Sequence, residues 1–337
     1  MRILIHLPIN SIYLGLLLLL LGGCLHGAEE ERALHTLSPS QLSQITFGSC
    51  NKEYKEQDIW SSIAANQSEL FIWLGDMVYP KEDSASALKN SLSRQKSHPE
   101  YQNFIANHMV LGVWDDHDFY EDGGDVTKSE KEEKKLALLD FLDVSEDSLA
   151  NASEGLYSHH SFQSEAGPVH LIILDARYDK LPWDQGQDRI LGETQWKWLE
   201  RTLKKHPNGI HIFASSIQLI PNRHRFDHWG RAPQERQRFL KLIEKYQIKN
   251  PIVISGDRHI AEISKLSIGE SQILWELTSS GLTHSYSSFS GEENPYRQGK
   301  VFFKRNFGLI RFDKERVSLE IKDDKNHLVA KQLIPIQ

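Results

Sequence analysis

Six short apolar runs recur along the chain, and each of them ends in polar or ionisable residues. Continuous apolar runs of this length are typical of strands that are buried on both faces. Amphipathic segments lie between several of them, and Pro233 suits the first turn of the last segment. Strands that alternate with helices predict an α/β fold. The expected strands lie in residues 45–51, 70–79, 109–118, 169–177, 210–218 and 251–259, and the expected helices in residues 58–67, 129–142, 193–206 and 233–246.

The pattern changes from about Ser271 onward. Apolar segments now follow one another with hairpin-like turns and without a helical segment between them. They lie in residues 272–281, 307–313, 316–323 and 328–336. We expect a set of antiparallel strands that completes the core.

Reactive side chains lie at or just after the C-terminal ends of the expected strands. In open α/β sheets, sites form beyond the carboxyl ends of the strands. Acids on a merely solvated surface would not be expected to keep to that position in run after run. The sequence therefore predicts that the following residues converge on one site: Cys50, Asp76, Asp116, His117, Asp175, Gln218, Asp257 and His259.

The segment VWDDHDFY, residues 113–120, places three acids around one histidine. Carboxylates gathered with a thiolate would repel one another unless cations were present, so metal ions are implied. Asp and His suit divalent or trivalent ions, and a thiolate with a phenolate favours a redox-capable metal such as iron. Two ions roughly 3.5 to 4 Å apart can clamp a phosphoryl group and activate water. Hydrolysis of phosphate esters is the reaction that fits this chemistry best.

Together these segments resemble the alkaline phosphatase D (PhoD-like) family of metallophosphoesterases. The resemblance runs from about Ile45 to His284 and rests on GSCN, LFIWLGDMVY, WDDHDF, LDARY, ISGDRHIAEI and LTSSGLTHS in this order. It implies a four-layer αββα sandwich over residues 45–337, with two central sheets. It also implies an alkaline phosphatase or phosphodiesterase activity and a metal centre of iron plus calcium, although other divalent ions are possible.

The resemblance also implies roles for single residues. Asp76 would bridge two metals, and His117 would be the catalytic histidine. Arg177 would contact the substrate phosphate, and Gln218 would bind substrate near the second metal. Asp122 is the one residue available for a supporting role that the family usually gives to an Asn-Asp pair. The implied metal ligands are Cys50, Asp76, Tyr79, Asp116, Asp257 and His259.

Simpler structural interpretations compete with some of these roles. Cys50 could be a small buried apolar residue, and an aromatic residue such as Tyr79 just past a strand is commonly part of a core. Asp115 and Asp118 could be supporting hydrogen-bond acceptors or part of a solvated turn rather than ligands. Trp229 could pin the loop that follows the Gln218 strand, or this loop could line the substrate entrance.

The N-terminal residues resemble an export signal. Arg2 precedes an apolar stretch over residues 12–21, and the segment Leu21-Gly22-Gly23-Cys24 resembles a bacterial lipobox. We expect residues 1–23 to be a lipoprotein signal peptide, Cys24 to be acylated, and residues 24–44 to be a tether. A lipid on Cys24 would anchor the protein to a membrane, facing the periplasm or the cell surface. A plain signal peptide and a membrane helix are the alternatives, but the stretch is short for a span of about 20 residues.

The leading hypothesis is a membrane-anchored hydrolase of phosphate esters. The net charge of −7 argues against broad nucleic-acid binding. A second hypothesis is a non-catalytic surface lipoprotein that binds a ligand or partner, and a third is a hydrolase of another bond on the same metal scaffold. One feature separates the enzyme from the binding protein: the complete set of Asp76, Asp116, His117, Asp257 and His259. A binding protein has no need of all five residues.

Overall fold

The computed structural model describes residues 41–145, 148, 152–183, 189–269 and 271–336. The expected signal peptide and Cys24 lie outside these residues, as does most of the expected tether. Among the described helices, none is long and apolar enough to cross a membrane.

The first of two sheets combines strands from the beginning of the described chain with strands from its C-terminal part. Its strand order is β13-β12-β11-β1-β2-β3. The three strands from the N-terminal half are mutually parallel, and β11 pairs antiparallel with β1. The strands are β1 (Gln44–Gly48), β2 (Leu70–Leu74), β3 (Met109–Val113), β11 (Asn306–Asp313), β12 (Arg316–Asp323) and β13 (Leu328–Pro335).

The second sheet is built from the middle of the chain, in the order β10-β8-β9-β7-β6-β5-β4. Strands β5, β6, β7 and β9 are parallel, and the other pairs are antiparallel. The strands are β4 (Ser158–Ser164), β5 (Gly167–Leu174), β6 (Ile210–Ser215), β7 (Asn250–Ser255), β8 (Ala261–Ile268), β9 (Gln272–Ser279) and β10 (Arg297–Phe302).

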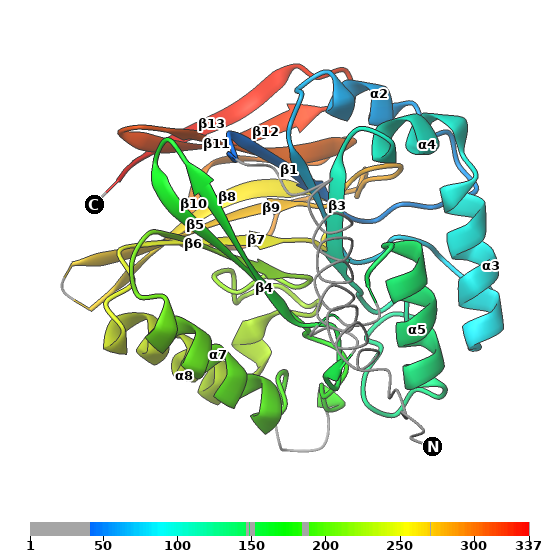
Figure 1. Ribbon diagram of the computed structural model, residues 1–337, viewed down its shortest axis with the longest axis horizontal. Helices are drawn as coiled ribbons and strands as arrows, with labels where there is room; N and C mark the ends of the chain where they lie inside the picture. Colours follow the sequence, from blue (N-terminus) through cyan, green and yellow to red (C-terminus); the bar gives the residue numbers. More distant parts are fainter. Residues whose placement is uncertain (1–40, 146–147, 149–151, 184–188, 270, 337) are drawn as a thin grey trace, which may run out of the picture. The chain divides into compact units, whose positions relative to one another are not determined.

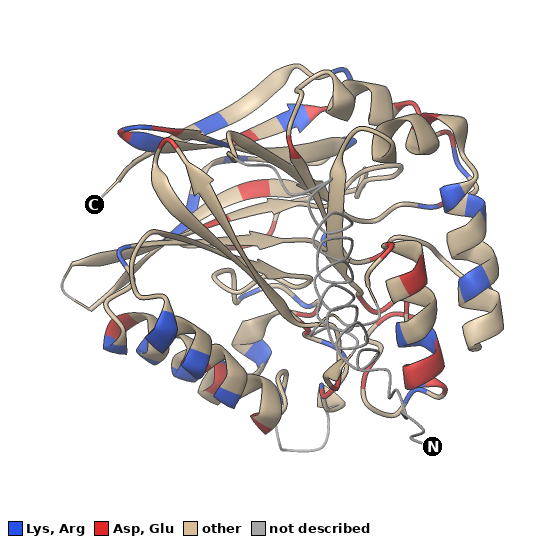
Figure 2. Cartoon of the chain, in the orientation of Figure 1, with Lys and Arg blue, Asp and Glu red and all other residues tan. Residues whose placement is uncertain are grey.

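Helices cover the outer sides of the two sheets, which confirms the expected αββα sandwich. Figure 1 shows α7 and α8 together on one side and α2 to α5 on another. Charged residues gather on the helices, whereas the parallel strands carry few (Figure 2). The helices are α2 (Ile59–Ala64), α3 (Ala85–Lys96), α4 (Pro99–Ile105), α5 (Lys131–Phe141), α7 (Glu193–Lys205) and α8 (Pro233–Lys245), with a short 3₁₀ helix, η2 (Trp229–Arg231).

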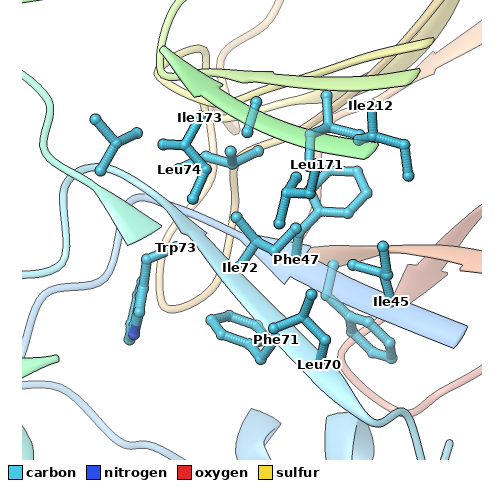
Figure 3. Close-up of a cluster of buried hydrophobic side chains, with 14 of the residues drawn as sticks. Ile45, Phe47, Leu70, Phe71, Ile72, Trp73, Leu74, Leu171, Ile173 and Ile212 are labelled. Carbon is cyan, nitrogen blue, oxygen red and sulfur yellow. The ribbon is translucent and has the colours of Figure 1, made fainter. Parts of the chain in front are cut away.

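The main core lies between the sheets. Ile45 and Phe47 of β1 pack toward Leu171 and Ile173 of β5 (Figure 3). All five residues of β2 are buried, because the second sheet covers one face of this strand and helices cover the other. That double burial explains why the run LFIWL is apolar throughout instead of alternating.

The expected antiparallel C-terminal strands are present, but they are divided. β11, β12 and β13 extend the first sheet, whereas β9 joins the second. The sequence pattern did not predict α3, α4, β4, β8 or β10. Strand β4 reads SHHSFQS and forms an edge of its sheet, so it lacks the apolar run that marks a buried strand.

Candidate metal centre

The centre lies where strands of both sheets end. Four of its residues adopt the left-handed backbone conformation, with φ of 62° at Cys50, 49° at Asp76, 67° at Asp257 and 55° at His259. This conformation is uncommon for residues other than glycine, and it clusters at functional sites because the surrounding structure must hold it. Each of these residues follows β1, β2 or β7 within four positions.

Two glycines allow these turns to approach one another. A Cβ on Gly75, where φ is +82°, would lie 2.6 Å from the backbone nitrogen of Asp115. A Cβ on Gly256 would lie 2.5 Å from the carbonyl oxygen of Leu74. No side chain fits at either distance. The turn after β7 therefore reaches the first sheet, and ligands from both sheets face one another.

Among the residues that the structure describes, three groups of side chains could hold a metal ion, and within each group the ligand atoms lie within 4.8 Å of one another. Asp76 belongs to two groups, and Asp116 also belongs to two. Shared carboxylates of this kind are how neighbouring metal ions are bridged. The donor set therefore fits a centre of more than one ion. The groups are Cys50, Asp76 and His259; Asp76, Asp116 and His117; and Asp115, Asp116 and Asp257.

Tyr79 lies beside the first group. Its hydroxyl donates to Asp76 Oδ2 at 2.8 Å and lies 3.5 Å from His259 Nε2. Cys50 Sγ lies 3.6 Å from the same Asp76 oxygen and is fully buried. The structure thus brings the thiol, the phenol, the imidazole and Asp76 together, although these four residues follow three different strands.

Burial and mutual repulsion oppose charge in this centre. Burial, and then the neighbouring carboxylates, raise the pKa of Asp76 and of Asp257 well above the usual range for aspartate. Burial and the charge of Asp76 likewise raise the pKa of the Cys50 thiol and the Tyr79 phenol. A bound cation reverses this effect because it favours the ionised form of each ligand. Without a bound cation, the ionised forms of these buried side chains are therefore unfavourable.

Asp118 and Asp115 have different surroundings. Asp118 accepts hydrogen bonds from the backbone N–H groups of Met77 (3.1 Å), Val78 (3.4 Å) and Asp115 (2.9 Å), so its carboxylate holds the loops around the centre. One oxygen of Asp115 is bonded by Arg177, whereas Oδ2 is buried without a hydrogen-bond partner. The free Oδ2 leaves Asp115 able to serve as a ligand.

His117 faces a cleft of about 510 Å³ beside the donor groups. Its backbone N–H donates to Asp76 Oδ1 (3.2 Å) and Asp116 Oδ1 (2.9 Å). Its ring lies against Tyr79, with 4.2 Å between centroids, and Nε2 lies 3.0 Å from Asp122 Oδ1. The Asp122 side chain is 97% exposed. Asp122 therefore lies beside the histidine on its solvent side.

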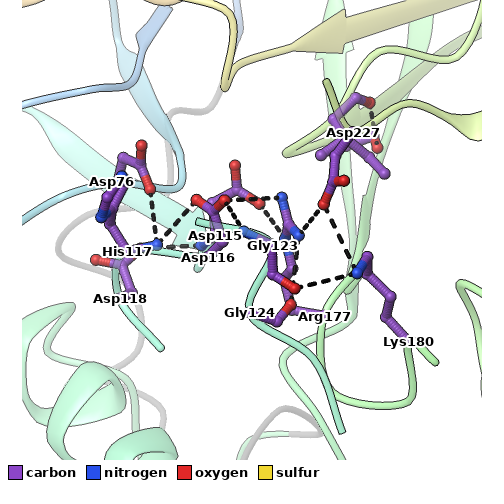
Figure 4. Close-up of polar contacts among 12 residues, drawn as sticks. Asp76, Asp115, Asp116, His117, Asp118, Gly123, Gly124, Arg177, Lys180 and Asp227 are labelled. Carbon is purple, nitrogen blue, oxygen red and sulfur yellow. Dashed lines mark hydrogen bonds and ion pairs between the residues drawn. The ribbon is translucent and has the colours of Figure 1, made fainter. Parts of the chain in front are cut away.

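The expectation that Arg177 contacts the substrate is wrong. Arg177 is fully buried, and its guanidinium bonds Asp115 and Asp227 and lies 3.8 Å from Asp116 (Figure 4). Its Nη1 also donates to the Gly124 carbonyl at 3.3 Å. A guanidinium without exposed surface cannot reach a substrate. Arg177 is a positioning residue that holds aspartates of the centre from behind.

The expectation for Gln218 is also wrong. Gln218 is fully buried, and its Nε2 donates to Glu262 Oε1 (2.9 Å) and Thr278 Oγ1 (2.8 Å) of the second sheet. It does not line the cleft. The backbone after β6 turns its side chain into the protein, so Gln218 binds no substrate.

Removal of the Arg177 charge should destabilise the protein. Arg177→Met leaves Asp115 buried without its ion-pair partner and removes the closest cation from Asp227, and breaking buried pairs of this kind costs about 3–5 kcal/mol. The free energy of unfolding from urea titration measures this loss. Arg231→Met is the control, because Arg231 lies 3.9 Å from Asp227 and is partly exposed, so its loss should cost less than about 1 kcal/mol. Equal costs for both variants would contradict the positioning role.

Several residues of the site had no role assigned from the sequence. His284 Nε2 lies 3.4 Å from the Tyr79 hydroxyl, and its ring lies 4.3 Å from that of His259. The LTHS segment that carries it was the available signal. The loop after β6 both lines the cleft and is pinned, since Phe226 faces the cleft while Trp229 is fully buried and donates to Ser215 Oγ at 3.1 Å.

Comparisons with known proteins agree with this geometry. The sequence pattern of the PhoD-like phosphatase family matches residues 45–322. No curated protein matches the chain. A solved structure of PhoD has a TM-score of 0.70 at 15% identity, over 89% of this chain and 69% of that chain. A purple acid phosphatase from yellow lupin (Lupinus luteus) seeds has a TM-score of 0.60 at 13% identity, over 88% of this chain and 54% of that one. A dimetal phosphatase from Danio rerio has a TM-score of 0.56 at 11% identity, over 88% and 100% of the two chains.

Proposed function

Since the chain belongs to the PhoD-like phosphatase family, we propose that it is a hydrolase of phosphate monoesters or diesters with a multinuclear metal centre. The observation that carries the proposal is the sharing of Asp76 and Asp116 among three adjacent donor groups at the wall of a cleft. When bound there, metal ions supply Lewis acidity that polarises the phosphoryl group and activates the attacking water.

We propose that the two ends of the centre take different ions. The end with Cys50, Tyr79 and His259 offers sulfur, phenolate and imidazole donors, which suit iron. The end with Asp115, Asp116 and Asp257 offers carboxylate oxygens only, which suit a hard cation such as calcium. Asp76 belongs to the first set and Asp116 to the second, and both belong to the middle group with His117, which would link the two ends.

Cationic side chains of the cleft replace Arg177 as candidates for holding the phosphate. Arg225, Arg231 and Arg258 line the cleft together with His117. Arg225 is exposed and Arg231 is partly exposed, whereas Arg258 is buried and its guanidinium pairs with Glu292, so Arg225 and Arg231 are the better candidates. A guanidinium pairs with two phosphate oxygens at once, which orients the ester. His117 lies near enough to the donor groups to give a proton to the leaving oxygen.

The test of this function is hydrolysis by the purified holoenzyme. We expect release of phosphate from a generic monoester or of alcohol from a generic diester, loss of the activity with a chelator, and recovery with added metal. Elemental analysis should find iron with a second metal. A protein that holds its metals and cleaves neither ester would instead support the non-catalytic surface lipoprotein.

The location outside the cytoplasm is a separate proposal, which rests on the Leu21-Gly22-Gly23-Cys24 segment. Cys24→Ser should abolish acylation and move the protein from the membrane fraction to the soluble fraction, because position 24 no longer carries the thiol that accepts the lipid. Incorporation of labelled fatty acid measures this directly. Cys50→Ser is the control, since Cys50 is buried and should not change acylation. A wild-type protein that never incorporates fatty acid would contradict the anchor.

A further inference from the structure

A cluster of histidines lies far from the metal centre, on the second sheet. His159 is on the edge strand β4, His170 on β5 and His211 on β6, and His206 follows α7. Ser161 and His170 are paired across β4 and β5, and His170 and His211 are paired across β5 and β6. The four imidazoles therefore gather on one side of this sheet.

The cluster is separate from the catalytic cleft. His170 precedes Asp175 at the carboxyl end of β5 by five residues. At about 3.3 Å per residue, this separation is roughly 16 Å along the strand. None of the four histidines lines the cleft.

Two ring nitrogens of this cluster lie at the spacing of metal ligands. His159 Nε2 lies 3.3 Å from His170 Nδ1. Ligands at about 2.0–2.1 Å from a tetrahedral zinc ion are separated by roughly 3.3 Å. The ring of His206 lies next to both, with centroids 4.7 Å from His159 and 4.8 Å from His170. His206 is only partly buried, so its ring can turn toward the other two.

The imidazoles of this cluster favour the neutral form, which can bind a metal, and the Ser161 hydroxyl lies 3.3 Å from His159 Nε2 and 3.1 Å from His170 Nδ1. Burial and then the neighbouring imidazoles lower the pKa of His159 to about 4, and burial with the charge of His206 lowers that of His170. His211 Nε2 bonds the His206 carbonyl at 2.7 Å, which fixes the ring and the turn before β6. His211 Nδ1 is buried without a partner. His211 thus holds the backbone of His206 beside β6 and is not itself a proposed ligand.

We propose that His159, His170 and His206 bind a divalent transition-metal ion of the zinc class at a second site. Neutral imidazoles suit zinc, copper and nickel ions, whereas calcium prefers oxygen. The ion would join the edge strand β4 to β5 and to the turn between α7 and β6. Its role is therefore structural, because an edge strand has a sheet partner on one side only.

The test is a zinc titration of the purified holoenzyme by isothermal calorimetry, with bound zinc counted by elemental analysis. His159→Gln and His170→Gln should each bind one zinc ion fewer than the wild type. Zinc should raise the thermal midpoint of the wild type and not that of these variants. Hydrolysis of a phosphate ester should be unchanged in all of them, because the cluster lies outside the cleft.

His160→Gln is the matched control, because this residue is next in β4 and its ring stacks on Phe162 toward the core between the sheets. It should keep the additional zinc ion. If His170→Gln does not fold, His159→Gln still decides the matter, since His159 lies on the edge strand and is partly exposed. Equal zinc binding by the wild type and His159→Gln would overturn the proposal and leave the 3.3 Å contact as a hydrogen bond between two imidazoles.

Discussion

Asp76→Asn should release metal from the centre and lower phosphate-ester hydrolysis by about 10³-fold or more. Asp76 belongs to two of the three donor groups, so its loss weakens ligand sets on both sides. An amide carries no charge to offset that of the cations. Metal ions supply several kcal/mol of transition-state stabilisation, and each 1.36 kcal/mol corresponds to a factor of ten in rate. Elemental analysis and steady-state kinetics measure the two losses together.

Asp118→Asn is the matched control for that prediction. Asp118 is an equally buried aspartate of the same region, but it bonds backbone N–H groups and belongs to none of the donor groups. This variant should lose stability and keep its metal content. Asp76→Asn with normal metal content would show that the shared carboxylate is not a ligand.

His117→Ala should keep near-normal metal content and lose rate by about 10²–10⁴-fold, the usual contribution of general acid catalysis. The imidazole faces the cleft, where a proton can reach the leaving oxygen. Esters with poor leaving groups need that proton most, so they should lose the most rate. A series of esters graded by the pKa of the leaving group measures this dependence. Equal losses for good and poor leaving groups would rule out the proton donor.

Asp116→Ala provides the contrast to His117→Ala. Asp116 belongs to two donor groups, so this variant should lose metal, and excess divalent cation should partly restore its activity. His117 also belongs to one donor group, so it could act as a proton donor or as a metal ligand. The metal content of His117→Ala separates these two roles. A His117→Ala variant that loses as much metal as Asp116→Ala would make His117 a ligand.

The sequence predicted much of the fold because strand burial leaves a local signature. A strand covered on both faces must be apolar throughout, and residues 70–74 show this without any knowledge of their neighbours. Edge strands have no such requirement, so β4 with its two histidines was not predicted. The division of the parallel strands between two sheets was also beyond the pattern, since β1 and β5 are both mostly buried and only the resemblance implied two sheets.

Position along the chain was a good guide to the centre and a poor guide to the direction of side chains. Cys50, Asp76, Asp257 and His259 come from three strand ends, and the structure brings them together. Arg177 also follows a strand, yet it turns inward to Asp227, a residue 50 positions away that no local pattern connects with it.

By itself, the sequence determined the residue types and the strand ends on which they lie, because burial and turn formation are local properties. Only the tertiary structure decided that Asp76 and Asp116 are shared among donor groups, that Arg177 and Gln218 are buried, and that three histidines from β4, β5 and the end of α7 lie side by side. The physical reason is that metal binding and electrostatic interactions depend on distances of a few ångströms between side chains, and these distances are set by packing between segments far apart in the chain.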